Sequence, residues 1–182
     1  MLNELLASLG FAVVLVLSGC SKQLEAHTEY AEATDFSQYR TYRWITDDLV
    51  LLQSGSGNPS IRNVENERRI RAAIEREFDA KGLRKATGDD AQLIVAFTVG
   101  TKVRYHIQGG AWYDILTEPN AAYTRGVLTI YVFDRASQQQ IWSAWTRKDL
   151  EPGDDPDTVI NAAVEVLLAE FPPGQPSASS SR

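Results

Sequence analysis

The sequence has little sulfur and little imidazole, with one cysteine, one methionine and two histidines among 182 residues. A lone cysteine cannot form an intramolecular disulfide, so the hydrophobic core must hold the fold even in an oxidising compartment. With no free thiol beyond Cys20, a Cys or Cys/His metal site is excluded, and a site of His and carboxylate ligands would have to form from His27 or His106 and distant residues. We therefore expect no metal and no cofactor.

Signatures of catalysis are also missing. Ser18 and Ser56 lie in no Gly-x-Ser-x-Gly elbow, so no nucleophilic hydrolase is indicated. Asp154, Asp155 and Asp157 lack the regular ladder, the glycine and the distal glutamate of an EF-hand, and helix capping explains them better. We expect no catalytic residues and a protein that is not an enzyme.

Basic residues are in the minority, with 18 Lys and Arg against 24 Asp and Glu, for a net charge of −6. Loss of residues 1–19 would remove only Glu4 and leave −5. Because affinity for nucleic acid comes from Lys and Arg that neutralise phosphates, this composition excludes a nucleic-acid partner.

No apolar run is long enough to span a membrane. The run from Leu5 to Leu17 has about 13 residues, whereas a transmembrane helix needs about 20, and this length fits the apolar region of a signal peptide. The four residues before it carry no Lys or Arg, unlike a usual signal peptide, which leaves open a true start upstream. The alternative to a signal peptide is a buried apolar helix with an incidental thiol.

The apolar run ends in a motif that resembles the lipobox of bacterial lipoproteins, made of Leu17, Ser18, Gly19 and Cys20. The resemblance implies cleavage before Cys20 and acyl chains, such as palmitate, on that cysteine. More than one acyl chain is enough for stable anchoring. Because Ser21 rather than Asp follows the cysteine, similarity to proteobacterial sorting implies the periplasmic leaflet of the outer membrane.

The mature chain is long enough for one core, and the expected organisation has four parts. The tether is so short, about 10 Å when fully extended, that the domain should lie against the membrane. The parts are a cleaved signal peptide at 1–19, the lipidated N-terminus and tether at 20–23, one domain at 24–173, and a disordered Pro/Ser-rich tail at 174–182.

Alternation and helical periodicity predict the order β-β-α-β-β-β-α. This order packs most simply as a two-layer α+β fold, with an antiparallel sheet and two α-helices on one face. The predicted strands are 24–30, 39–44, 91–103, 126–134 and 139–150, and the predicted helices are 60–81 and 155–171.

Both helices have apolar stripes and recognisable ends. Gly82 is expected in the left-handed position after the first helix, and Asp155 and Pro156 are expected to begin the second. Acidic and basic residues alternate at ion-pair spacing on the first helix, which predicts a solvated face rather than an anionic-lipid patch. That face contains Glu65, Glu67, Arg68, Arg69, Arg71, Glu75, Arg76 and Glu77, while Ile70, Ile74 and Phe78 form the buried stripe.

Four segments together resemble the bacterial lipoprotein family called domain of unknown function 4136. They are the stretches 35–44, with Asp-Phe-Ser-x-Tyr-x-Thr-Tyr-x-Trp, 70–77, 81–83 and 171–173. The resemblance covers nearly all of the mature domain. It implies the same architecture and location, and it implies no activity, because none is known for the family.

A long connection between two predicted strands contains the aromatic residues that are candidates for contact with a partner or ligand. It runs from Tyr105 to Tyr123 and contains two glycines beside Trp112 and Tyr113. Long loops in compact domains are often functional, and Trp and Tyr are favoured at interfaces. These four aromatic residues could contact an envelope protein, a glycan strand or the lipid surface. The alternative is a loop that folds back, with Trp112 covering a sheet edge.

Two classes of function remain open. The first is a non-catalytic interaction or scaffolding module of the cell envelope, held at the membrane by its lipid. The second is a carrier that binds a small molecule or lipid between the sheet and the helices. An apolar cavity larger than about 300 Å³ at that place would favour the carrier, and a filled core would count against it.

Overall fold

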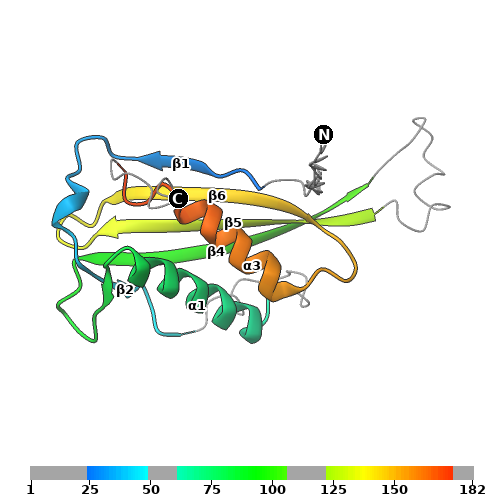
Figure 1. Ribbon diagram of the computed structural model, residues 1–182, viewed down its shortest axis with the longest axis horizontal. Helices are drawn as coiled ribbons and strands as arrows, with labels where there is room; N and C mark the ends of the chain where they lie inside the picture. The colour runs from blue at the N-terminus through cyan, green and yellow to red at the C-terminus, as the bar shows by residue number, and fades with distance from the viewer. Residues whose placement is uncertain (1–23, 49–60, 106–121, 174–182) are drawn as a thin grey trace, which may run out of the picture.

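The computed structural model describes residues 24–48, 61–105 and 122–173. These residues form a six-stranded sheet with two helices packed on one face (Figure 1). The predicted α+β class, with two helices against one sheet, is confirmed.

The elements agree closely with the predicted order. The additional strand β3 has only two residues, which is too short for an alternation pattern to reveal. The elements are β1 (His27–Tyr30), the 3₁₀ helix η1 (Phe36–Gln38), β2 (Thr41–Trp44), α1 (Val64–Ala80), β3 (Arg84–Lys85), β4 (Leu93–Tyr105), β5 (Ala122–Asp134), β6 (Gln140–Leu150) and α3 (Pro156–Leu168).

The sheet is mixed rather than wholly antiparallel, with the strand order β1-β6-β5-β4-β2-β3. The predicted meander of β4, β5 and β6 is antiparallel, and β1 pairs antiparallel with β6. In contrast, β2 runs parallel to both β3 and β4. The reason is the connection: α1 carries the chain back across the sheet before β3 and β4 begin, and such a crossover gives parallel neighbours.

The core lies between the inner face of the sheet and the helices. Alternate residues of the central strands point inward, and their side chains are almost completely buried, as are Ile74 and Phe78 of α1. The aromatic ring of Phe171 packs within 5.0 Å of Trp142 and 5.4 Å of Phe78, measured between ring centroids. Each large side chain buried in this way contributes roughly 1.5–3 kcal/mol.

The helix ends follow the local sequence. Asn63 caps α1, because its side-chain oxygen accepts the N–H of Asn66 at 2.8 Å, so the helix begins a few residues later than predicted. Gly82 has φ of +79° as predicted, and the Leu83 N–H donates to the Phe78 carbonyl at 2.9 Å in a Schellman ending. Asp155 caps α3 at the predicted place, with Pro156 as the first helical residue.

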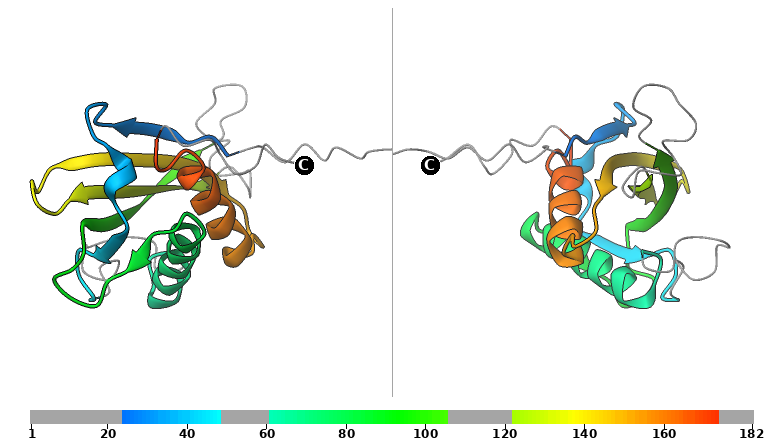
Figure 2. Two further views of the ribbon diagram at one scale, coloured as in Figure 1. Left: turned by 60° about the vertical axis from the view of Figure 1, so that its left-hand side comes forward. Right: turned by 90° about the vertical axis from the view of Figure 1, so that its right-hand side faces the viewer.

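The sheet curves around the helix layer, as both views of Figure 2 show. The two longest strands, β4 and β5, run on past the N-terminal ends of both helices (Figure 1). Neither α1 nor α3 therefore extends over the far end of these two strands (Figure 1). Within the described residues, neither helix has the length and apolar character needed to cross a membrane.

Candidate functional site: a cavity between the sheet and the helices

A cavity of about 530 Å³ lies where the helix layer gives way to the projecting strands. Its size is within the range of about 300–1,000 Å³ found for small-molecule sites. Most of the lining is apolar. It comprises Leu24, Ile61, Asn66, Ile70, Val99, Thr124, Gly126, Val127, Leu128, Thr146, Lys148, Leu150, Glu151, Pro152, Asp154, Pro156, Val159, Ile160 and Ala163.

The cavity exists because the inward-facing side chains become small or polar along the strands. On β5 the buried residues Ile130 and Leu128 are followed on the same face by Gly126 and Thr124. Gly126 also leaves room for its neighbour on β6: a Cβ atom at this position would lie 3.3 Å from Leu150 Cδ1. The inward-facing side chains of β5 are therefore smaller toward this end of the sheet than near its middle.

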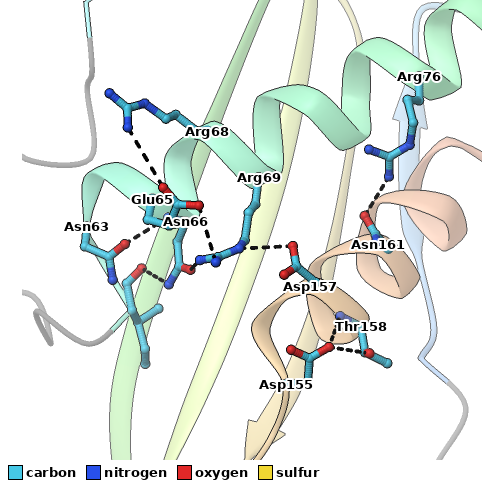
Figure 3. A network of polar contacts seen from close by, with 11 residues as sticks. Asn63, Glu65, Asn66, Arg68, Arg69, Arg76, Asp155, Asp157, Thr158 and Asn161 are labelled. Carbon is cyan, nitrogen blue, oxygen red and sulfur yellow. Dashed lines mark hydrogen bonds and ion pairs between the residues drawn. The ribbon is translucent and has the colours of Figure 1, made fainter.

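The two helices that border the cavity, α1 and α3, are joined by polar contacts (Figure 3). Arg69 of α1 donates from Nε to Asp157 Oδ1 of α3 at 3.0 Å and from Nη1 to Asn66 Oδ1 at 3.0 Å. Further along, Arg76 donates to Asn161 Oδ1 at 2.7 Å. The amide of Asn66, which lines the cavity, is thus engaged on its oxygen side, and its nitrogen donates to the Ile61 carbonyl at 3.0 Å.

The segment before β1 supplies another wall. Thr146 of β6 is 2% exposed, and its hydroxyl donates to the Glu25 carbonyl at 2.7 Å. This hydrogen bond ties the chain to β6 and places Leu24 on the cavity lining. The cavity is therefore built partly from the residue four positions after Cys20.

The opening of the cavity is marked by the lining residues that are exposed, namely Glu151, Pro152 and Pro156. Beside them, Lys148 Nζ lies 2.8 Å from Asp154 Oδ2. The hydrogen bond from Lys148, followed by that from the Glu151 N–H, holds the pKa of Asp154 below its usual value. The carboxylate of Asp154 is therefore charged near neutral pH.

The lining consists mainly of aliphatic side chains. Among the residues that the structure describes, no group of three or more His, Cys, Asp or Glu side chains comes close enough to hold a metal ion. Burial raises the pKa of Tyr39 to about 12 and also raises the pKa of Tyr42, but neither residue lines the cavity. The expectation that the protein is not an enzyme stays a prediction.

A second hollow, of about 240 Å³, lies at the opposite ends of α1 and α3. Its lining includes Phe36, Leu83 and Phe171, which belong to the core, together with Arg40 and Lys81. Its volume is below the usual range for ligand sites. The larger cavity is therefore the better candidate.

The site residues predicted from the sequence lie largely outside the described part of the chain. This holds for Trp112 and Tyr113 and for the lipobox residues Leu17, Ser18, Gly19 and Cys20. The backbone of Tyr105 ends β4.

Tyr123 is half-buried in β5, on the face of the sheet opposite the cavity. The Arg125 guanidinium lies 5.8 Å from the centroid of its ring, and that guanidinium also pairs with Asp149 at 2.9 Å. Tyr123 is therefore packed beside an ion pair, and the loop hypothesis stays a prediction.

The cavity residues were missed by sequence reasoning, although a signal was present. On β6 the inward residues change from Trp142 and Ala144 to Thr146 and Lys148, so the apolar alternation ends partway along the strand. A long strand whose inner face becomes polar indicates incomplete cover. What such a pattern cannot give is the position of the helices above it.

Sequence comparison places the chain in a family. The model described as "Domain of unknown function (DUF4136)" matches residues 26–173. The chain belongs to this family. The family predicted from the sequence is thus confirmed, and membership assigns no activity. No curated protein matches the sequence.

Solved structures include similar chains at low identity. A PDZ domain protein from Parabacteroides distasonis is 14% identical with a TM-score of 0.55, over 85% of this chain and 36% of that one. This chain thus spans about a third of that protein, and the likeness concerns the fold alone. A PelC dodecamer from Paraburkholderia phytofirmans is 10% identical with a TM-score of 0.48, over 80% of this chain and 95% of that one.

Proposed function

We propose that the protein is a lipid-anchored, non-catalytic envelope protein whose domain binds a small apolar or lipidic ligand in the cavity. The observation that supports the proposal is the cavity of about 530 Å³ between the helices and the sheet. A filled core at this place would have favoured a pure scaffolding module. The cavity favours the carrier instead.

The way in which the polar lining atoms are engaged also supports an apolar ligand. The side chains of Asn66 and Thr146 make their hydrogen bonds to protein groups, and Lys148 is paired with Asp154. The rest of the buried cavity lining is mainly aliphatic and comes from residues such as Ile70 and Leu128. Because these polar groups already have partners in the protein, an apolar ligand can bind without leaving any of them unpaired.

The proposed anchor gives the cavity a source of ligand. Cys20, with its acyl chains, would hold the domain at the periplasmic leaflet of the outer membrane, and Leu24 already belongs to the cavity lining. Three residues, 21–23, can span at most about 10 Å. The opening would therefore stay close to the lipid surface, from which apolar molecules can be taken.

Filling the cavity tests the proposal. Ala163 lies on α3, is 8% exposed and lines the cavity, so the ring in Ala163→Phe can enter the empty volume. Binding of the neutral fluorescent probe N-phenyl-1-naphthylamine would be measured with the full chain carrying Cys20→Ser. We expect the Phe variant to lose at least about tenfold in affinity, because the ring occupies the space that the probe needs.

The neighbouring residue provides a matched control. Ala162 is exposed on the same helix, so Ala162→Phe adds the same ring outside the cavity and should leave binding unchanged. Val159→Trp, at a second lining position, guards against misfolding of the first variant. Equal binding by folded Ala163→Phe and Ala162→Phe variants, or no binding by the parent, would rule out the cavity as a ligand site.

A further inference from the structure

We propose, building on ligand binding in the cavity, that the ligand is a single-chain amphiphile with a cationic or zwitterionic headgroup. Its hydrocarbon chain lies between the helices and the sheet, and its headgroup lies at the opening beside Glu151. An anionic amphiphile of the same chain length binds less well. The proposal rests on the distribution of apolar and charged groups along the lining.

The lining is apolar at its buried end. Ile70 is 3% exposed, Leu128 is 8% exposed and Ala163 is 8% exposed, and these three side chains come from α1, β5 and α3. A hydrocarbon chain inserted here exchanges water for aliphatic contacts on several sides. The buried end offers no charged group to a ligand, so any charge on the ligand must stay at the opening.

The charge at the opening is negative. Among the described residues that line the cavity, the charged groups are Lys148, Glu151 and Asp154, which sum to a net charge of −1. The ammonium of Lys148 is already neutralised by Asp154 at 2.8 Å and also donates to the Asp149 carbonyl at 3.4 Å. It is therefore a poor partner for an anionic headgroup.

Glu151 is the group left to meet a headgroup. It is exposed, it lines the cavity, and no ion pair to it is found within 24–48, 61–105 and 122–173. The N-terminus of α3 beside it carries a partial positive charge, but the Asp155 carboxylate caps that end and accepts the Thr158 N–H at 2.9 Å. The carboxylate of Glu151 thus makes the charge at the opening negative.

A further cation near this end of the helix layer, Arg69, is also paired. Arg69 of α1 lies 3.3 Å from Glu65 Oε1 and 3.0 Å from Asp157 Oδ1. An anionic headgroup would have to compete with two carboxylates for it. A quaternary ammonium or phosphocholine group meets Glu151 without breaking an existing ion pair.

The proposal can be tested with three probes that share one saturated chain: dodecyltrimethylammonium, dodecylphosphocholine and laurate. Each would be titrated by calorimetry, below its micelle concentration, into the full chain carrying Cys20→Ser. For the parent we expect laurate to bind roughly fivefold to tenfold more weakly than dodecyltrimethylammonium, as one nearby charge predicts. Glu151→Lys should reverse this order.

A matched control separates a local charge from the overall charge. Glu165 is exposed on α3 and does not line the cavity, so Glu165→Lys makes the same change in net charge elsewhere. The proposal is supported if Glu151→Lys reverses the preference and Glu165→Lys does not. It is overturned if both variants act alike, or if the parent binds laurate as well as the cation.

The same titrations distinguish the headgroup preference from ligand binding in the cavity, the proposal on which it rests. If the three probes bind with equal affinity, and Ala163→Phe abolishes that binding, ligand binding in the cavity stands and only the headgroup preference is wrong. If no probe binds the parent, both proposals fail together. Binding that survives Ala163→Phe and Val159→Trp would place the amphiphile outside the cavity and overturn both.

Discussion

Glu67 is a fully buried carboxylate on α1, with 0% exposure. It accepts hydrogen bonds from Arg71, one turn later, at 3.2 Å from Nε and 3.0 Å from Nη2. The same guanidinium lies 4.9 Å from the centroid of the Trp44 ring and donates to the Thr46 carbonyl at 3.2 Å. Arg71 therefore connects the first two turns of α1 to the chain that follows β2.

This arrangement predicts a large effect of a single truncation. Arg71→Ala removes a charged hydrogen-bond partner of a buried carboxylate, which is expected to lower the free energy of unfolding by about 3–5 kcal/mol. Urea denaturation at neutral pH, with the midpoint and slope both fitted, measures the loss. Arg68→Ala is the control, because the Arg68 side chain is 68% exposed and its contact with Glu65 is 3.9 Å long. Equal stability of the two variants would contradict this role for Arg71.

Sequence reasoning interpreted the charged residues of α1 as one solvated face, and for Glu67 this interpretation is wrong. The i,i+4 spacing to Arg71 was visible, and the ion pair itself is present. The burial was not visible, because it depends on where Trp44 and the segment after β2 lie against the helix. The spacing of charged residues along a helix indicates possible ion pairs. It says little about which distant segments of the chain bury those residues.

At the scale of elements, the end of α1 shows how one residue fixes a change of direction. Gly82 adopts φ of +79°, its N–H donates to the Asp79 carbonyl at 3.0 Å, and Leu83 then enters the core with 5% exposure. The next two residues form β3, which lies beside β2. The turn thus sets the path from the helix layer back to the sheet.

We predict that Gly82→Ala lowers the free energy of unfolding by about 1–2 kcal/mol, the cost of a left-handed backbone with a Cβ atom. No atom lies within 4 Å of the added Cβ, so the cost is conformational rather than a clash. Gly88→Ala is the matched control, because that position is equally open and has no positive φ. Thermal unfolding of both variants provides the comparison. A loss as large at position 88 as at 82 would contradict the backbone argument.

The elements themselves could largely be predicted from the sequence, since their signals are local. Periodicity located both helices, and capping chemistry located Gly82, Asp155 and Pro156 within one residue. The parallel pairing of β2 with β4 could not be predicted, because Tyr42 meets Leu93 only after α1 has carried the chain across the sheet. Pairing between distant segments is a property of the whole fold.

At the scale of the whole molecule, the proposed anchor is tested most directly by lipid incorporation. We expect the parent to incorporate labelled palmitate in a bacterial host, and Cys20→Ser to incorporate none, because acylation needs the thiol. Ser21→Ala should keep the label. A parent that takes up no palmitate would rule out the anchor and leave the cavity proposals standing.

The cavity is the part of the molecule that the sequence could not place. Its lining comes from two helices, three strands, the segments before β1 and α1, and the connection between β6 and α3, so no single pattern contains it. The loss of apolar alternation on β5 and β6, around Gly126 and Thr146, indicated only that cover was incomplete. The volume follows from the lengths of α1 and α3 relative to the strands beneath them.

The position of Leu24 has a mechanical consequence. The residue is part of the cavity wall and stands just after the proposed tether, and the Thr146 hydroxyl holds its neighbour Glu25 against β6. Beyond that point the chain is secured by the four residues of β1 at an edge of the sheet. In the lipid-anchored chain proposed above, tension on the tether would therefore reach the cavity wall at Leu24 before it reaches the pairing of β1 with β6.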